Sequence, residues 1–408
     1  MSLDIAAAPD LQATHQRKKE RAWPGRLWRR IVMLWKWVFG AILCTNPVLS
    51  LLVVGWTQRA GQRSAFRCWW RRSPVHKRGV SFPAREVSLR QREQAHWPNW
   101  ILAQNFTATL VEATNARGFF RKTRSIPSAF LASLGANLKL GLQSVLNTWL
   151  LTMPGCALLL LAWFAGWNNS FHKGYELAAV GPSTGVIGLA LFMAAMLYVP
   201  LAQARQAVTG EWRAFYDFRL LRKLLRQRWL DTVLLAGLYS LLSLPIMVSM
   251  VVPALLPQMS GLEAMSDAEI LTFLKRYYFF VSLLGFVLFL FLRVFAARVY
   301  AAAILSALRR GAIEIDELRP TERNLLGRLE LLNEAPREKR HLIIRALGWT
   351  STKIGRFAAT AAVLFVWFTF VAQIFVREFF NAHPVVGWLN QALVQLPWFS
   401  YIPEHLRG

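Results

Sequence analysis

The sequence predicts an all-α protein built as a polytopic bundle of transmembrane helices, and three observations carry this prediction. Hydrophobic residues make up 55% of the 408 positions and charged residues only 17%, which is too apolar for a water-soluble protein of this length. Several apolar runs reach the ~20 residues that a helix needs to cross ~30 Å of hydrocarbon. Tryptophan, which favours the boundary between lipid and water, stands at the ends of such runs, as at Trp149, Trp167 and Trp229.

Five of these runs are expected to span the membrane and to form one helical membrane domain over residues 145–376. They extend over residues 147–167, 185–204, 229–256, 277–308 and 357–376. An earlier apolar run, 31–56, is treated separately below because its charge pattern differs.

Basic residues alternate along the chain and therefore predict the orientation of the spans. Segments 57–144, 204–228 and 309–356 contain 15, 7 and 11 lysines and arginines. Segments 168–183, 257–276 and 377–408 contain only 1, 2 and 2. Because basic residues near spans stay in the cytoplasm, we expect the first three on that side. The 377–408 segment is then extracytoplasmic.

The run 31–56 contains the turn-prone dipeptide Asn46-Pro47 near its middle and has basic residues at both ends. Seven lysines and arginines precede it within residues 1–30, and the basic segment 57–144 follows it. A single crossing would export one of these clusters. We therefore expect a basic cytoplasmic N-terminal segment and a re-entrant hairpin over 31–56, with a proline-kinked sixth span as the alternative. Lys36 would lie near the membrane boundary, with its amine extended to the headgroups.

The segment 57–144 is expected to be a basic cytoplasmic loop that contains interfacial helices. Arginines and aromatic residues are mixed in its first part, "RAGQRSAFRCWWRRSPVHKRG". Such a mixture can contact nucleic acid, but beside a membrane basic side chains meet anionic headgroups while tryptophan lies at the interface. We therefore expect anionic phospholipid as a partner and regard nucleic acid as unlikely.

The segment 203–229 shows the clearest amphipathic pattern. Apolar residues recur every three or four positions and define one helical face. Basic residues occupy much of the opposite face and are predicted to contact anionic lipid: Arg213, Arg219, Arg222, Lys223 and Arg226. We expect a helix that lies flat on the inner leaflet, or two shorter helices joined at Gly210-Glu211. A solvated helix packed on another cytoplasmic loop is the alternative.

The stretch "YVPLAQARQAVTGEWRAFYDF", 198–218, resembles a pattern in bacterial polytopic inner-membrane proteins classed as a domain of unknown function. The match covers about 40 residues around the sequence A-x-x-x-x-x-G-x-W-R-A-F-x-D-F. That family has no established activity. The resemblance therefore implies a bacterial inner membrane and nothing about chemistry.

The insertion 309–356 mixes acidic and basic residues, and Pro320-Thr321-Glu322 predicts the start of a helix. A helical hairpin that turns near Ala335-Pro336 fits this segment. It can dock on the other cytoplasmic elements or hold a partner.

Ionisable residues inside spans are costly and usually functional, and few are present here. Arg293 and Arg298 fall ~24 and ~32 Å along a helix from residue 277, so we expect them at the membrane boundary, in reach of headgroups. The seven histidines have no metal-ligand spacing, and no nucleotide-binding or nucleophile motif occurs. No catalytic residue, metal or cofactor is therefore predicted.

Two classes of function remain, with a third behind them. We expect a non-catalytic membrane protein that organises lipid or partner subunits, including a membrane-protein partner or a second copy of the chain. A carrier or channel subunit is the main alternative, because prolines such as Pro245 and Pro253 interrupt one apolar run. An enzyme that acts on lipid-linked substrates is the third.

Overall fold

A computed structural model describes residues 22–79, 119–162, 180–255 and 265–332, together with parts of 353–365 and 390–400. All regular secondary structure in these residues is helical. The six long helices are α2 (Ala22–Cys44), α3 (Pro47–Arg72), α7 (Phe119–Ala162), α9 (Val180–Thr209), α11 (Trp229–Leu255) and α12 (Asp267–Arg309). The short ones are α4 (Pro74–Lys77), η3 (Trp212–Tyr216), α10 (Phe218–Gln227), η5 (Ile315–Glu317) and α13 (Pro320–Arg328).

Four of the described helices, α7, α9, α11 and α12, are long and apolar enough to cross a membrane. This confirms the predicted all-helical, membrane-protein character. The remaining run, 357–376, lies largely outside the described residues. The number of helices that cross the membrane therefore stays a prediction.

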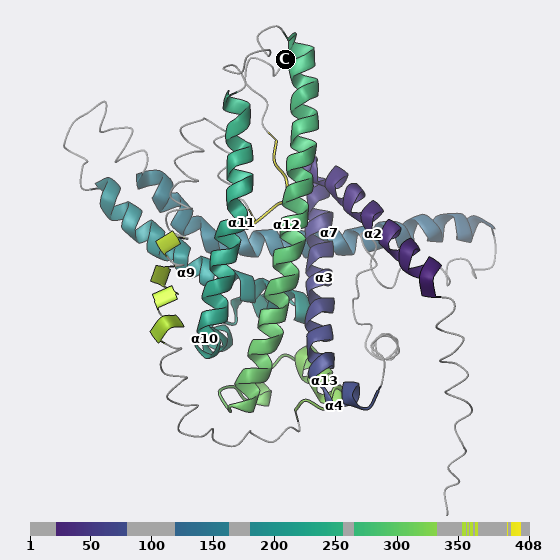
Figure 1. Cartoon of the computed structure of the whole chain (residues 1–408). Coiled ribbons are helices and arrows are strands. Elements are labelled where there is room, and N and C mark those ends of the chain that lie inside the picture. The colour runs from purple at the N-terminus through teal and green to yellow at the C-terminus, as the bar shows by residue number, and fades with distance from the viewer. Residues whose placement is uncertain are drawn as a thin grey trace, which may run out of the picture.

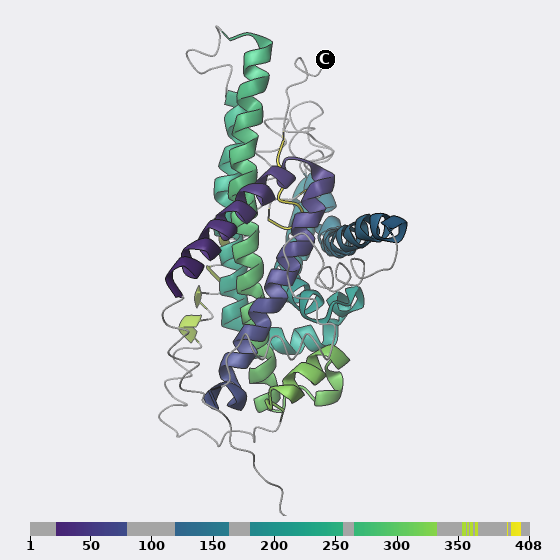
Figure 2. The ribbon, with the colours of Figure 1, turned by 90° about the vertical axis from the view of Figure 1, so that its right-hand side faces the viewer.

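The long helices are not all parallel. In Figure 1, α3, α11 and α12 run upright and α7 lies across them; Figure 2, turned by 90°, shows α7 nearly end-on. α12 packs against α2, α3, α9 and α11 and is the central upright element. α9 packs along α7.

Glycines allow α7 to approach its neighbours closely. A Cβ added at Gly141 of α7 would collide with the backbone carbonyl of Leu51 in α3, and one at Gly55 of α3 would collide with the carbonyl of Asn137. Further along α7, a Cβ at Gly155 would lie 2.8 Å from the backbone nitrogen of Phe192 in α9. Small residues therefore set both crossings of α7, as is common between membrane helices.

The 31–56 run belongs to two helices, α2 and α3, which are separated by a break between Cys44 and Pro47, and not to one kinked helix. Asn46 caps α3: its side-chain oxygen accepts from the backbone N–H groups of Val48 at 2.9 Å and Leu49 at 3.2 Å, and Pro47 takes the first helical position. The start of α2 and the end of α3 both point to the lower side in Figure 1, as a hairpin requires. How deeply this hairpin enters a membrane stays a prediction.

Several boundaries differ from the sequence expectation, because helices continue beyond their apolar cores; α2 begins at Ala22 and α12 at Asp267. α3 continues past residue 56 to Arg72, and α7 begins at Phe119, well before residue 145. The ends of the segment 57–144 are thus parts of long helices, and residues 80–118 lie outside the described residues. Apolar content marks where a helix meets lipid, whereas helix ends depend on caps and breakers.

α11 runs without interruption through both of its prolines. Pro253 lacks the N–H that would bond to the Ser249 carbonyl four residues earlier, and the Tyr277 hydroxyl of α12 donates to that carbonyl instead.

Candidate anionic-lipid interface

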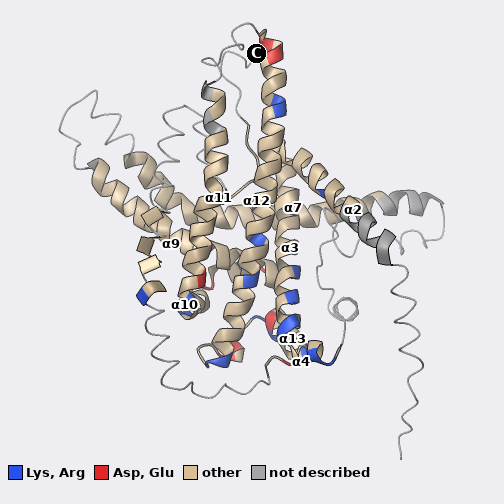
Figure 3. Cartoon of the chain, in the orientation of Figure 1, with Lys and Arg blue, Asp and Glu red and all other residues tan. Residues whose placement is uncertain are grey.

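Basic residues gather at one end of the molecule. Figure 3 shows lysines and arginines along the lower parts of α3 and α12 and on α4 and α10. Large apolar side chains on other surfaces of the long helices are exposed, among them Trp35, Leu131, Val186, Leu234 and Phe280. An apolar exterior above a basic end is the pattern of a protein that lies in lipid and meets headgroups at one side.

The segment 203–229 folds as two helical pieces after a break. α9 ends at Thr209, and Gly210 adopts a positive φ of 74°, a conformation that glycine adopts readily. η3 and α10 follow, and α11 begins at Trp229. The expectation of a single helix over 203–229 is wrong, and the alternative, a break at Gly210-Glu211, is confirmed.

The apolar face of α10 is covered by protein, which corrects the expectation that it lies in the leaflet. Leu220, Leu221 and Leu224 are buried, and they belong to a core with α9, α12 and α13 residues such as Tyr300 and Leu325. The period of the pattern located the apolar face, but it does not say whether lipid or protein covers it. The alternative, a helix that packs on another part of the protein, describes this face.

The outward face of η3 and α10 is basic and aromatic. All five residues predicted to contact lipid are exposed: Arg213, Arg219, Arg222, Lys223 and Arg226. Trp212 and Phe218 are 47% and 50% exposed beside them, and the Arg213 guanidinium lies 5.5 Å from the centroid of the Trp212 ring. Exposed basic side chains beside exposed aromatic rings suit an interface between headgroups and hydrocarbon. Whether they contact lipid stays a prediction.

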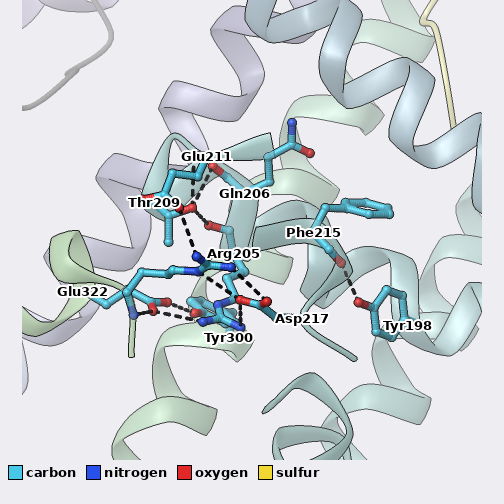
Figure 4. Close-up of polar contacts among 10 residues, drawn as sticks. Tyr198, Arg205, Gln206, Thr209, Glu211, Phe215, Asp217, Tyr300 and Glu322 are labelled. Carbon is cyan, nitrogen blue, oxygen red and sulfur yellow. Dashed lines mark hydrogen bonds and ion pairs between the residues drawn. The ribbon is translucent and has the colours of Figure 1, made fainter. Parts of the chain in front are cut away.

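A buried ion-pair cluster holds this surface in place (Figure 4). Arg205 of α9 is fully buried, and its Nη1 lies 2.9 Å from Asp217 Oδ2, an ion pair without hydrogen-bond geometry. Its Nη2 donates to Glu322 Oε2 at 3.4 Å. Asp217 is the residue between η3 and α10, and Glu322 lies in α13. One guanidinium thus joins the end of α9 to the η3–α10 segment and to α13.

Glu322 has three donors although its side chain is fully buried. The Tyr300 hydroxyl of α12 and Arg205 donate to it, and so does the backbone N–H of Arg319 at 3.0 Å, which makes Glu322 part of the cap of α13. The helix start predicted at Pro320-Thr321-Glu322 is confirmed. A buried carboxylate needs such donors, since burying a charge without partners is costly.

Arg319 closes the cluster from the solvent side. Its Nε and Nη2 donate to the two oxygens of Asp217 at 3.1 and 2.9 Å, and its Nη1 lies 3.5 Å from Glu211. The fork of two parallel bonds is the strong form of an arginine–carboxylate pair. Lys223 of α10 adds a bond to Glu317 of η5 at 2.6 Å. This bond lowers the pKa of the Glu317 carboxyl.

Three other predicted boundary residues lie in different surroundings. Lys36 is half-buried within α2. Arg298 is exposed and donates to Ser64 Oγ of α3 at 3.0 Å. Arg293 is buried, with 4% of its surface exposed, so the expectation that its guanidinium extends to headgroups is wrong. Length along a helix predicts depth, but not which neighbours surround the side chain.

The sequence reasoning did not find Arg205, Asp217 or Glu322 as a group. Arg205 and Asp217 both lie inside the 198–218 stretch, which therefore contains two of the three charges of this group as well as the turn glycine. Their 12-residue spacing carries no helical signal, and Glu322 is more than 100 residues away. The available signal was an arginine that directly follows the apolar run 185–204.

Comparisons with protein-family models, with curated proteins and with solved structures gave no significant match. The resemblance of residues 198–218 to bacterial inner-membrane proteins therefore stays a prediction, and the function is argued from the structure alone.

Proposed function

We propose that the protein is a non-catalytic integral membrane protein of the bacterial inner membrane that binds anionic phospholipid at its basic end. Through this end it organises lipid or partner subunits at the cytoplasmic surface. The proposal rests mainly on one observation: the exposed arginines of η3 and α10 lie beside exposed aromatic rings, on a surface that a buried ion-pair cluster fixes to α9 and α12.

Charge and packing both support this proposal. Anionic headgroups attract a basic segment with ~1 kcal/mol per lysine or arginine. Because the apolar face of α10 is covered by protein, its arginines are held on the outer side without insertion of the helix. The rule that basic residues stay inside orients this end toward the cytoplasm.

The test compares two double variants of the full chain in neutral detergent. Arg219→Gln with Arg222→Gln removes two exposed charges from α10, while Lys275→Gln with Arg276→Gln removes two exposed charges near the other end of α12. Native mass spectrometry measures the binding of phosphatidylglycerol and of phosphatidylcholine to each protein.

The α10 variant should bind phosphatidylglycerol up to ~30-fold more weakly at low salt, since two charges contribute ~2 kcal/mol. The control variant should bind it as the unmodified protein does, and added salt should reduce the difference. Equal affinity for phosphatidylglycerol in both variants would contradict the proposal.

A carrier or channel subunit is the second candidate, and buried polar side chains favour it. Gln58 of α3, Ser144 and Thr148 of α7, Gln203 of α9 and Arg293 of α12 are all buried where these helices meet. Polar groups from several helices are what a translocation pathway requires. The argument from prolines is weaker, since α11 continues through both of them and the carbonyl that Pro253 frees already has a donor.

A further inference from the structure

Arg293 is a buried cation among neutral partners. It lies in α12, against which α3 and α9 pack, and 4% of its surface is exposed. Its Nη1 donates to Ser144 Oγ of α7 at 3.3 Å. In the part of the chain that the structure describes, no carboxylate lies within ion-pair distance of its guanidinium.

The surrounding polar groups are neutral amides and hydroxyls. With its side-chain oxygen turned toward Arg293, Gln58 accepts hydrogen bonds from Arg293 and Ser144, and its nitrogen donates to the Gln203 backbone carbonyl at 3.2 Å. Gln203 itself donates to Thr148 Oγ1 at 2.6 Å. This network orients Arg293 but supplies no negative charge.

Two donors near this point have no partner. Arg293 Nη2 and the Tyr239 hydroxyl of α11 are buried and make no hydrogen bond within the described chain. Tyr239 lies in one buried cluster with Leu292 and Ala296, the α12 residues that flank Arg293. A buried cation without a counter-charge costs several kcal/mol, and an unmet buried donor costs more on top of that.

We propose that Arg293 and Tyr239 bind a small monovalent inorganic anion, with chloride as the representative ligand. The anion supplies the missing negative charge and accepts from both unmet donors. Residues that enclose this point are almost fully buried, with Gln58 and Gln203 each 1% and Tyr239 2% exposed. Enclosure of this kind suits an ion and excludes a lipid headgroup.

The test uses the full chain in neutral detergent without anionic lipid, so its outcome does not depend on the proposed lipid interface. Thermal unfolding, followed by fluorescence of the 18 tryptophans, is measured as sodium chloride replaces sodium gluconate at constant ionic strength. Binding of radioactive chloride is measured in parallel. The unmodified protein should show a saturable rise in unfolding temperature and saturable chloride binding.

Arg293→Met should abolish both responses, and Arg298→Met, on the exposed face of the same helix, should keep both. Tyr239→Phe removes only one hydroxyl and should weaken chloride binding by about tenfold or more, as loss of a hydrogen bond to a charged group does. This variant keeps the test decisive if Arg293→Met does not fold. Chloride binding that is absent, or that is unchanged in Tyr239→Phe, would overturn the proposal.

Discussion

Removal of the Glu322 carboxylate should destabilise the fold strongly, because this fully buried group serves three donors at once. In Glu322→Ala, the Tyr300 hydroxyl, the Arg319 backbone N–H and Arg205 Nη2 lose their acceptor. Each buried donor left without a partner costs ~1–3 kcal/mol. Arg205 keeps its ion pair with Asp217, 2.9 Å away, so the total loss of stability is smaller than the sum of three such costs. We expect a loss of ~3–5 kcal/mol, the range for breaking a buried ion pair.

The assay is equilibrium unfolding of the detergent-solubilised protein in increasing dodecyl sulfate, followed by tryptophan fluorescence. Glu330→Ala is the matched control, because Glu330 pairs with Arg78 through side chains that are 39% and 65% exposed, and such a pair contributes at most ~1 kcal/mol. Adding Arg205→Met to Glu322→Ala should recover part of the loss, since it removes the under-compensated charge. A loss in Glu322→Ala no larger than in Glu330→Ala would refute the reasoning.

Three further predictions follow from other contacts. Gly141→Ala should destabilise the protein because the added methyl group meets the α3 backbone. Gly135→Ala on the same helix has open space around it and should be neutral or stabilising by up to ~1 kcal/mol. The unfolding temperatures of both variants test this, and similar shifts in the two variants would contradict the close crossing of α7 and α3. Because the pKa of Glu317 is lowered in the folded protein, its bond to Lys223 contributes fully to the free energy of unfolding above pH ~4.5, and this contribution is lost as the pH falls through the folded pKa. Lys223→Gln should therefore make the free energy of unfolding depend less on pH below pH ~4.5. An unchanged pH dependence would contradict this bond. A cysteine at position 20 should react with an impermeant maleimide only after the cells are opened, and labelling of intact cells would exclude a cytoplasmic N-terminus.

Local signals in the sequence located helix breaks well. Asn46-Pro47, Gly210 and Pro320 each act through their own backbone chemistry, and each marks a helix boundary in the structure. Apolar runs likewise predicted the cores of α7, α9, α11 and α12. These features depend on residues that are close in sequence, so a single sequence contains them.

The buried polar groups could not be predicted in the same way. Arg293 lies inside the predicted span 277–308, and its position alone is equally consistent with a headgroup contact. Its burial depends on α3, α7 and α9, which cross at glycines far away in the chain. Glu322 looks like an ordinary helix-capping residue until α13 packs beside α9 and brings it to Arg205. Long-range packing decides whether a charge meets water, lipid or another charge.

Binding of anionic phospholipid at the basic end is tested most directly by the lipids that co-purify with the intact protein in mild detergent. Mass spectrometry of the retained lipids, compared with the lipids of the source membrane, gives the enrichment of each class. We expect enrichment of anionic over zwitterionic phospholipid, and loss of that enrichment in Arg219→Gln with Arg222→Gln. Retained lipids with the composition of the membrane itself would contradict it.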